Sequence, residues 1–272
     1  MLVFCYIFYF SDKLVAVNDG SKKVRILCLV MTSPENHKTK AIHIQATWGK
    51  RCDKLLFVSE QEDKSLPIVR VDVKTGREHL TAKTMGAFGH IFEDHINEAD
   101  WFLKADDDTY VIIENLKYFL SSQDSETPIF FGHAFHVIVK QGYASGGAGY
   151  VLSKEALRRF AKRQKGECGV EDLGAEDVQM GLCMQILGVK LGDSRDSLGR
   201  SRFHCFNPAT HMQGGEHFPD WYFKYDKYGA QKVILSSIYL FIWSLYILFH
   251  VSIKIGNNQL MQNDSVNPLT TK

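Results

Sequence analysis

The sequence predicts an α/β fold with a mostly parallel central sheet and helices on its faces. Two observations support this prediction, namely the apolar patterns and their order along the chain. Short apolar runs of strand length alternate with longer segments in which apolar residues recur every three to five positions. The resulting order is β-α-β-β-α-β, and its simplest closure is a parallel sheet covered by helices.

The amino-terminal half of the chain supplies most of these elements. Strands are expected over 24–31, 54–58 and 68–73 and from Trp101 onward, and helices over 36–49 and 77–97. The first strand ends at the loop Thr32-Ser33-Pro34, and the fourth runs into Asp106-Asp107-Asp108. Because ligands of open α/β sheets bind beyond the carboxyl ends of the strands, both loops belong to the expected site.

The carboxyl-terminal half continues the pattern. Strands are expected over 129–132 and 148–152, and helices over 111–120 and from Lys154, with Ser153 as the N-cap. The segment Ser145-Gly146-Gly147-Ala148-Gly149 precedes a strand. Its glycines let the backbone approach a ligand closely, and a tight structural turn explains them equally well.

Composition and charge exclude several classes of protein. The 272 residues carry 32 Lys and Arg against 31 Asp and Glu, so the net charge of +1 argues against a dedicated nucleic-acid-binding protein. With 45% hydrophobic and 23% charged residues, the chain is neither wholly disordered nor wholly membrane-embedded. One run, Val233 to Ile253, has the length and apolar character of a membrane span, and a buried core helix is the alternative.

The cysteines favour disulfides over a zinc site. No Cys-x-x-Cys pair occurs among the six cysteines. In a secretory domain, two local disulfides would join Cys28 to Cys52 and Cys168 to Cys183. Buried free thiols are the alternative that the spacing leaves open.

The three adjacent aspartates are the strongest chemical signal. Carboxylates this close repel one another, so a fold that holds them together usually supplies a cation. Asp106 and Asp108 are two apart, and on an extended segment they would point to the same side. That arrangement suits Mn²⁺ or Mg²⁺, with substrate phosphates completing the coordination, and a solvated acidic turn is the alternative.

Two further segments are candidates for chemistry. Glu176-Asp177 could supply a general base, although Glu171-Asp172 is a near-duplicate and an exposed acidic turn is an alternative. The aromatic segment from Trp221 to Tyr225 could stack on a sugar ring, and core packing explains it as well.

Together, these segments resemble the β1,3-glycosyltransferases related to the fringe proteins, over about residues 22–228. The matching segments are Val30-Met31-Thr32, Ala46-Thr47-Trp48, 101–110, Lys140-Gln141-Gly142-Tyr143, 151–157 and Gly192-Asp193-Ser194-Arg195-Asp196. The resemblance implies a GT-A-type nucleotide-sugar-binding fold. It also divides the chain into an apolar anchor-and-stem remnant (1–21), a glycosyltransferase domain (22–228) and a carboxyl-terminal apolar helix with a polar tail (229–272).

The resemblance also implies an activity and its residues. The expected reaction is the inverting transfer of galactose from UDP-galactose to the 3-hydroxyl of O-linked GalNAc on glycoproteins, with Mn²⁺, in the Golgi lumen. A single-pass membrane anchor and a homodimer are further expectations, and no nucleic-acid partner is expected. The implied roles are metal binding by Asp106 and Asp108, binding of the nucleotide sugar by Met31, Arg77, Lys83 and Asp107, catalysis by Glu176 and Asp177 with Asp177 as the base, and acceptor binding by Trp221 and Tyr222.

Two alternatives to this activity stay open. One is a non-catalytic, chaperone-like or binding member of the family, because the family's carboxyl-terminal metal-ligand histidine has no counterpart in this sequence. The other is a fringe-like transferase that uses another acceptor.

Overall fold

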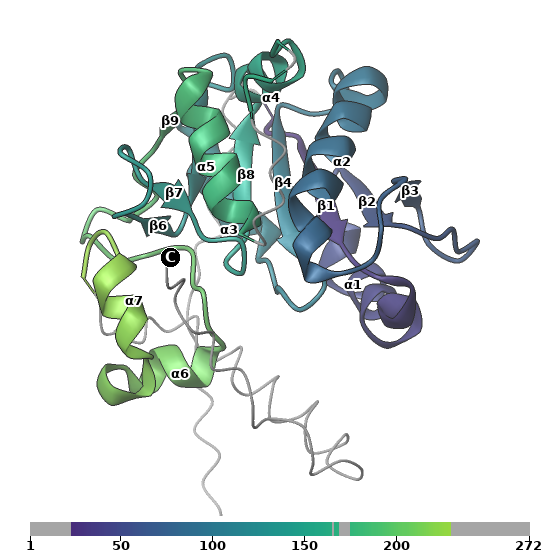
Figure 1. Cartoon of the computed structure of the whole chain (residues 1–272). Helices are drawn as coiled ribbons and strands as arrows, with labels where there is room; N and C mark the ends of the chain where they lie inside the picture. The colour runs from purple at the N-terminus through teal and green to yellow at the C-terminus, as the bar shows by residue number, and fades with distance from the viewer. Residues whose placement is uncertain (1–22, 165, 169–174, 230–272) are drawn as a thin grey trace, which may run out of the picture.

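The computed structural model of the chain describes residues 23–164, 166–168 and 175–229 (Figure 1). The expected amino-terminal remnant and the apolar run from Val233 to Ile253 lie outside these residues. Within the described ranges, none of the helices has the length and apolar character needed to cross a membrane.

A seven-stranded sheet forms the centre of the molecule, in the order β3-β2-β1-β4-β8-β5-β9. The strands are β1 (Ile26–Met31), β2 (Lys54–Ser59), β3 (Ile68–Arg70), β4 (Trp101–Asp106), β5 (Ile129–Gly132), β8 (Tyr150–Ser153) and β9 (Lys190–Leu191). Neighbouring strands are parallel except at β8, which runs antiparallel to both β4 and β5. The prediction of a mostly parallel α/β sheet is confirmed.

Helices cover both faces of the sheet (Figure 1). They are α1 (Ile42–Ala46), α2 (Leu80–His95), α3 (Ile113–Ser121), α4 (Lys154–Ala161) and α5 (Glu176–Ile186), whereas α6 (Pro208–Gln213) and α7 (Asp220–Tyr225) lie beside the sheet (Figure 1). Alternate residues of each strand enter opposite cores, because side chains of a strand alternate between its faces. Leu29 and Phe102 pack with α2, α4 and α5, whereas Val30 and Leu103 pack with Trp48 and α3.

The expected helix over 36–49 is broken into short pieces. A π-helical turn (His37–Ala41) leads into α1, and a 3₁₀ turn (Trp48–Arg51) follows. The break falls at Thr47, whose dihedral angles of −116° and −111° are not helical. At Gly49, a Cβ would lie 2.7 Å from the carbonyl oxygen of Ile44, so the close approach after the break requires glycine.

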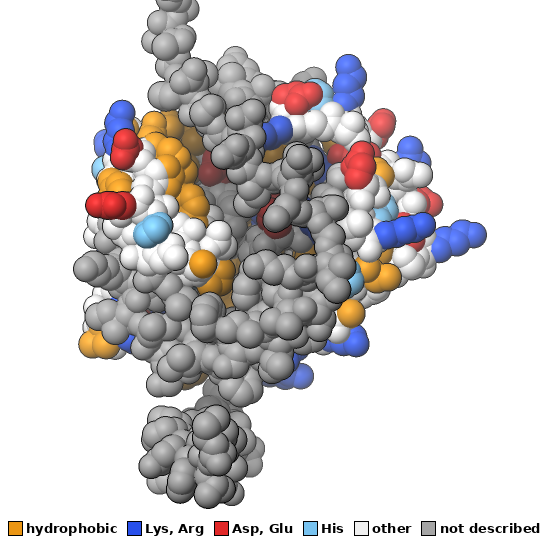
Figure 2. All heavy atoms as spheres, turned by 90° about the horizontal axis from the view of Figure 1, so that it is seen from below, with side chains coloured by type: hydrophobic (Ala, Val, Ile, Leu, Met, Phe, Trp, Pro, Cys, Tyr) orange, Lys and Arg blue, Asp and Glu red, His pale blue; other side chains and the backbone are white. Residues whose placement is uncertain are grey.

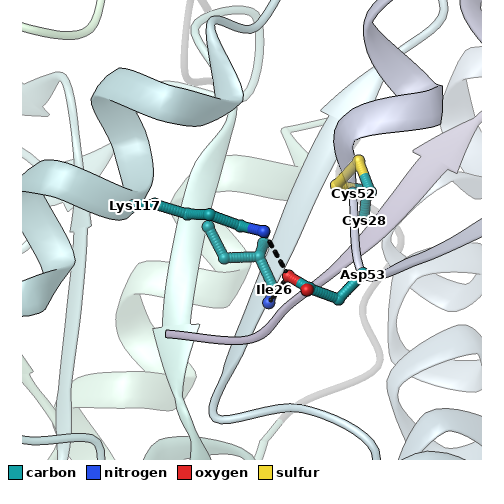
Figure 3. Close-up of a disulfide and its surroundings, with 5 residues drawn as sticks. All are labelled: Ile26, Cys28, Cys52, Asp53 and Lys117. Carbon is teal, nitrogen blue, oxygen red and sulfur yellow. Dashed lines mark hydrogen bonds and ion pairs between the residues drawn. A yellow bond between two sulfur atoms is a disulfide. The ribbon is translucent and has the colours of Figure 1, made fainter. Parts of the chain in front are cut away.

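Both expected disulfides are present, so the alternative of free thiols does not hold for these four cysteines. Cys28 in β1 is bonded to Cys52, directly after the 3₁₀ turn (Figure 3). Beside this bond, Asp53 accepts the backbone N–H of Ile26 at 2.9 Å and pairs with Lys117 of α3 at 2.7 Å (Figure 3). The Cys28–Cys52 bond and Asp53 thereby fix the helical pieces to the sheet.

A smaller aromatic cluster lies beside the sheet. The hairpin β6 (Ala134–Phe135) and β7 (Tyr143–Ala144) packs against α7, and Phe135, Tyr143, Phe218 and Tyr222 form its buried centre. Strands of two residues leave no periodic pattern, so this hairpin was not predicted from the sequence.

Candidate active site

The three aspartates lie in a turn at the carboxyl end of β4. The chain turns through Asp107 and Asp108, and the backbone N–H of Thr109 donates to the carbonyl oxygen of Asp106 at 3.1 Å. The extended geometry expected for Asp106 and Asp108 is therefore wrong, because β4 ends at Asp106. Asp108 is exposed and makes no hydrogen bond or ion pair with the described part of the chain.

Asp107 is held by residues that come from two other elements. One carboxylate oxygen accepts the hydroxyl of Thr32, just after β1, at 2.9 Å, and the other pairs with Lys40 at 3.0 Å. Burial lowers the pKa of Lys40, but the hydrogen bond and charge of Asp107, with the charges of Asp108 and Asp106, outweigh it and raise that pKa. The aspartate turn thus acts on Lys40 as one negative centre.

Lys83 reaches the same region from α2. Its ammonium group is buried and donates to the carbonyl oxygen of Thr32 at 2.5 Å and to Glu60 at 2.8 Å. Thr32 therefore links Lys83 to Asp107, two residues that the resemblance assigns to the nucleotide sugar. The second carboxylate oxygen of Glu60 is buried and has no partner among the described residues.

Asp106 is joined to Glu176 by a buried lysine. The ammonium group of Lys104 lies 2.7 Å from Asp106 Oδ1 and 3.7 Å from Glu176 Oε2. The other oxygen of Glu176 accepts the hydroxyl of Tyr150 at 2.7 Å. Burial raises the pKa of Glu176, against the charge of Lys104 and the Tyr150 hydrogen bond, which lower it. Burial lowers the pKa of Lys104, but the charges of Glu176 and Asp106 outweigh it and hold that pKa above its usual value.

Asp177 is the second residue of α5, next to Glu176, but it has a different environment. It is partly exposed, and its Oδ2 accepts the backbone N–H of Gly146 at 3.1 Å. The glycine segment therefore lies against the α5 carboxylates. The near-duplicate pair Glu171-Asp172 lies outside the described residues.

The remaining expected site residues make no side-chain hydrogen bond or ion pair with the aspartate turn or the α5 carboxylates in the described part of the chain. Met31 is buried at the end of β1, level with Asp106 in the β1–β4 ladder. Arg77 is exposed in the turn before α2, and no hydrogen bond or ion pair joins it to the described residues. Tyr222 is buried and stacks on His133, which agrees with core packing, whereas Trp221 keeps 44% of its surface exposed. Figure 2 shows hydrophobic side chains gathered on the side of α6 and α7.

Sequence reasoning assigned no role to Lys40 or Lys104. Lys104 stands two residues before Asp106 on a strand, and the period-two rule places both on the same face. That signal was available in the segment Lys104-Ala105-Asp106. Lys40 carries no comparable signal, because it lies in the π-helical turn, which no sequence pattern predicted.

Comparison with known proteins identifies the family of the chain. The profile of the Fringe family, described as Fringe-like, matches residues 21–205 and so contains every strand of the central sheet and the carboxylates of the site. The chain belongs to the Fringe-like family. This match confirms the predicted resemblance to the fringe-related glycosyltransferases and agrees with a GT-A-like fold.

Individual relatives of this Fringe-like chain are glycosyltransferases. It is 46% identical over 210 residues to glycoprotein-N-acetylgalactosamine 3-beta-galactosyltransferase 1 of Xenopus laevis, covering 76% of this chain and 58% of the relative. It is 29% identical over 177 residues to the beta-1,3-glucosyltransferase of Mus musculus, covering 64% of this chain and 36% of that protein. The chain thus spans less than two thirds of the length of either relative.

Proposed function

We propose that this chain is an inverting β1,3-galactosyltransferase that transfers galactose from UDP-galactose to the 3-hydroxyl of GalNAc on glycoproteins. The transferred galactose and the GalNAc acceptor are those in the name of the Xenopus relative, and UDP-galactose is the donor that the family resemblance implies. One structural observation supports the chemistry most. The aspartate turn and the α5 carboxylates, far apart in the sequence, are joined through Lys104 and so belong to one site.

The donor side of the proposed site consists of the ends of β1 and β4. In this proposal Lys40, whose side chain is 40% exposed, offers its charge to the diphosphate, and Thr32 orients Asp107 beside the sugar. The buried Lys83 adds positive charge behind Thr32, whose carbonyl oxygen it binds. The exposed Asp108 and the Oδ2 of Asp106, which has no partner among the described residues, offer hard oxygen ligands. These ligands fit Mn²⁺ when phosphate oxygens complete its coordination. Within the described residues no group of three His, Cys, Asp or Glu side chains could hold a metal alone. Bound Mn²⁺ would neutralise the negative charge that develops on the UDP leaving group.

The acceptor side uses Asp177 as the general base. A base must lie within hydrogen-bonding reach of the hydroxyl that it deprotonates, so it must be accessible. Asp177 is partly exposed, and the Gly146 N–H fixes its orientation. The deprotonated 3-hydroxyl attacks the anomeric carbon as UDP leaves from the opposite face, and a single displacement converts the α-linked donor to a β-linkage. Trp221 offers an exposed aromatic ring to the acceptor sugar.

The proposed compartment is the lumen of the Golgi, where the chain would act as a membrane-anchored enzyme. Two disulfides in the described domain support an oxidising compartment, because disulfides persist in the secretory pathway and are rare in the cytosol. A homodimer remains part of the proposal. Size-exclusion chromatography with light scattering would test it.

A transfer assay tests the proposed function directly. Purified protein is incubated with a GalNAc-bearing peptide, UDP-galactose and Mn²⁺, and the product is identified by mass spectrometry and linkage analysis. The expected product is a β1,3-linked galactose, and the Asp108→Ala variant is the control. Product no higher than in that control would reject the proposal.

Panels of donors and acceptors separate the alternatives. Preference for UDP-glucose would move the chain towards the glucosyltransferase relatives. Transfer to a sugar other than GalNAc would indicate a fringe-like enzyme with another acceptor. Calorimetry that finds no metal-dependent UDP binding would favour a non-catalytic family member.

A further inference from the structure

The pair formed by Lys104 and Glu176 is buried in the described domain, although both residues are charged. Lys104 is 3% exposed and Glu176 is 6% exposed. Burying charges costs free energy unless they are paired and hydrogen-bonded, so such pairs call for an explanation. Lys104 pairs with Glu176 on one side and with Asp106 on the other.

The surroundings hold this pair in place. The Tyr150 hydroxyl donates to Glu176, and the Tyr150 ring lies beneath the Lys104 ammonium group at 5.8 Å. A Cβ at Gly146 would lie 3.3 Å from Glu176 Oε2 and 3.7 Å from Lys104 Nζ. The glycine segment therefore closes tightly over the pair, and Asp106, with 36% of its side chain exposed, is the member of the network that faces solvent.

We propose that Glu176 is a positioning residue that acts through Lys104 to set the net charge felt by a cation at Asp106. This inference rests on the proposed function, in which Asp106 is a ligand of Mn²⁺. Lys104 alone would neutralise Asp106 and weaken its attraction for a cation. Glu176 balances Lys104, so that Asp106, Lys104 and Glu176 together carry one net negative charge.

The charge balance makes a specific prediction for two variants. Glu176→Gln keeps an acceptor for Tyr150 but leaves Asp106 and Lys104 with no net charge, so Mn²⁺ binding weakens by about tenfold or more. Lys104→Met combined with Glu176→Gln restores one net negative charge at Asp106, and binding recovers towards that of the unaltered chain. Lys104→Met alone is avoided, because it leaves Glu176 buried without a charged partner.

Mn²⁺ affinity is measured directly rather than through activity. The full chain is titrated with Mn²⁺ in the presence of UDP, and bound metal is followed by loss of the free-ion signal in electron paramagnetic resonance. Glu114→Gln removes an exposed carboxylate from α3 and is the control for general charge effects, with an expected change within about twofold. Circular dichroism and thermal unfolding confirm that each variant is folded.

Each outcome decides the inference. Weaker binding in Glu176→Gln with recovery in the double variant supports it, because a direct metal ligand would not be rescued by a second substitution. Unchanged circular dichroism and thermal unfolding in Glu176→Gln exclude a purely structural cause of the weaker binding. Weaker Mn²⁺ binding without recovery in the double variant overturns the inference, and so does unchanged Mn²⁺ binding in Glu176→Gln. In either case, galactose transfer by the unaltered chain still supports the proposed function. If the unaltered chain transfers galactose without binding Mn²⁺, the inference fails alone. If it neither binds Mn²⁺ nor transfers galactose, both proposals fail.

Discussion

At the scale of the residue, the site separates two neighbouring carboxylates by their environment. Both oxygens of Glu176 are engaged, one by Tyr150 and the other by Lys104, and the side chain is buried. Asp177 is partly exposed and accepts backbone N–H groups. A base must reach its substrate, so these contacts favour Asp177 over Glu176.

Replacing Asp177 with asparagine tests this assignment. Asparagine keeps an oxygen for the Gly146 N–H but cannot accept the acceptor's proton. We expect kcat to fall by roughly 10²- to 10⁴-fold while KM for UDP-galactose changes little. Steady-state kinetics with a GalNAc-peptide measure both constants, and full activity in Asp177→Asn would remove Asp177 as the base.

At the scale of the element, local signals predicted the ends of some helices and failed for others. Ser153 was predicted as the N-cap of α4, and its hydroxyl does accept the backbone N–H of Ala156 at 3.0 Å. A cap depends on a few adjacent residues, so the sequence is sufficient to find it. The break at Thr47 depends on packing of Gly49 against Ile44 and Leu55, which no local pattern contains.

Two helical glycines give a matched prediction about element packing. A Cβ at Gly181 in α5 would lie 2.3 Å from the Cβ of Tyr143 in β7, whereas a Cβ at Gly89 in α2 meets nothing within 4 Å. We expect Gly181→Ala to destabilise the fold by about 1–3 kcal/mol through overpacking. Gly89→Ala should stabilise it by roughly 0.5–1 kcal/mol, because alanine favours helices.

Urea unfolding followed by circular dichroism measures both glycine variants. Opposite signs for the two variants are expected. A neutral Gly181→Ala variant would contradict the close packing of α5 on β7.

The Cys28–Cys52 disulfide gives a second prediction at this scale. It closes a loop of 24 residues that contains α1 and both flanking helical turns. Replacing both cysteines with alanine should lower the free energy of unfolding by about 2–4 kcal/mol, because the unfolded chain regains loop entropy. Thermal unfolding of the double variant and of the unaltered chain, under the same conditions, measures the change.

At the scale of the whole molecule, the central sheet followed from the sequence but the aromatic cluster did not. The strand periodicities of β1, β2 and β4 are local, and their parallel pairing follows from chain order. The cluster depends on contacts between distant segments, such as the bridge between Phe135 and Asp226. The same holds for the site, where the aspartates were found by motif but Lys104 was assigned only from its contacts with Asp106 and Glu176.

Three histidines, in this cluster and in the segment before α7, have shifted pKa values, so the stability of the molecule depends on pH. Burial lowers the pKa of His133, but hydrogen bonds with Asp226 and Cys205 outweigh it and raise that pKa to about 10. Burial and the charges of neighbouring histidines lower the pKa of His204 to about 3, and burial with the charge of His133 lowers that of His211 to about 4. Relative to the ordinary value of 6.5, the pKa of His133 is raised, whereas those of His204 and His211 are lowered.

These opposite shifts predict a stability maximum near an ordinary histidine pKa. Because its native pKa is raised, His133 contributes fully to the stability of the fold below pH 6.5, and this contribution is lost as the pH rises towards 10. Lowered native pKa values make the unfolded chain bind more protons below 6.5, so His204 and His211 reduce stability as the pH falls. We therefore expect stability to decline on both sides of about pH 6.5.

Single variants separate the two sides of this maximum. Thermal unfolding is measured from roughly pH 5 to pH 9 for the unaltered chain, His211→Gln and His133→Gln. His211→Gln should flatten the acid side only, because glutamine keeps an acceptor for the backbone N–H of Phe206 and does not titrate. His133→Gln should flatten the alkaline side and lower stability throughout, because Asp226 then remains buried without its charged partner. If stability falls equally steeply with decreasing pH in His211→Gln, protonation of His211 does not limit the stability of the fold.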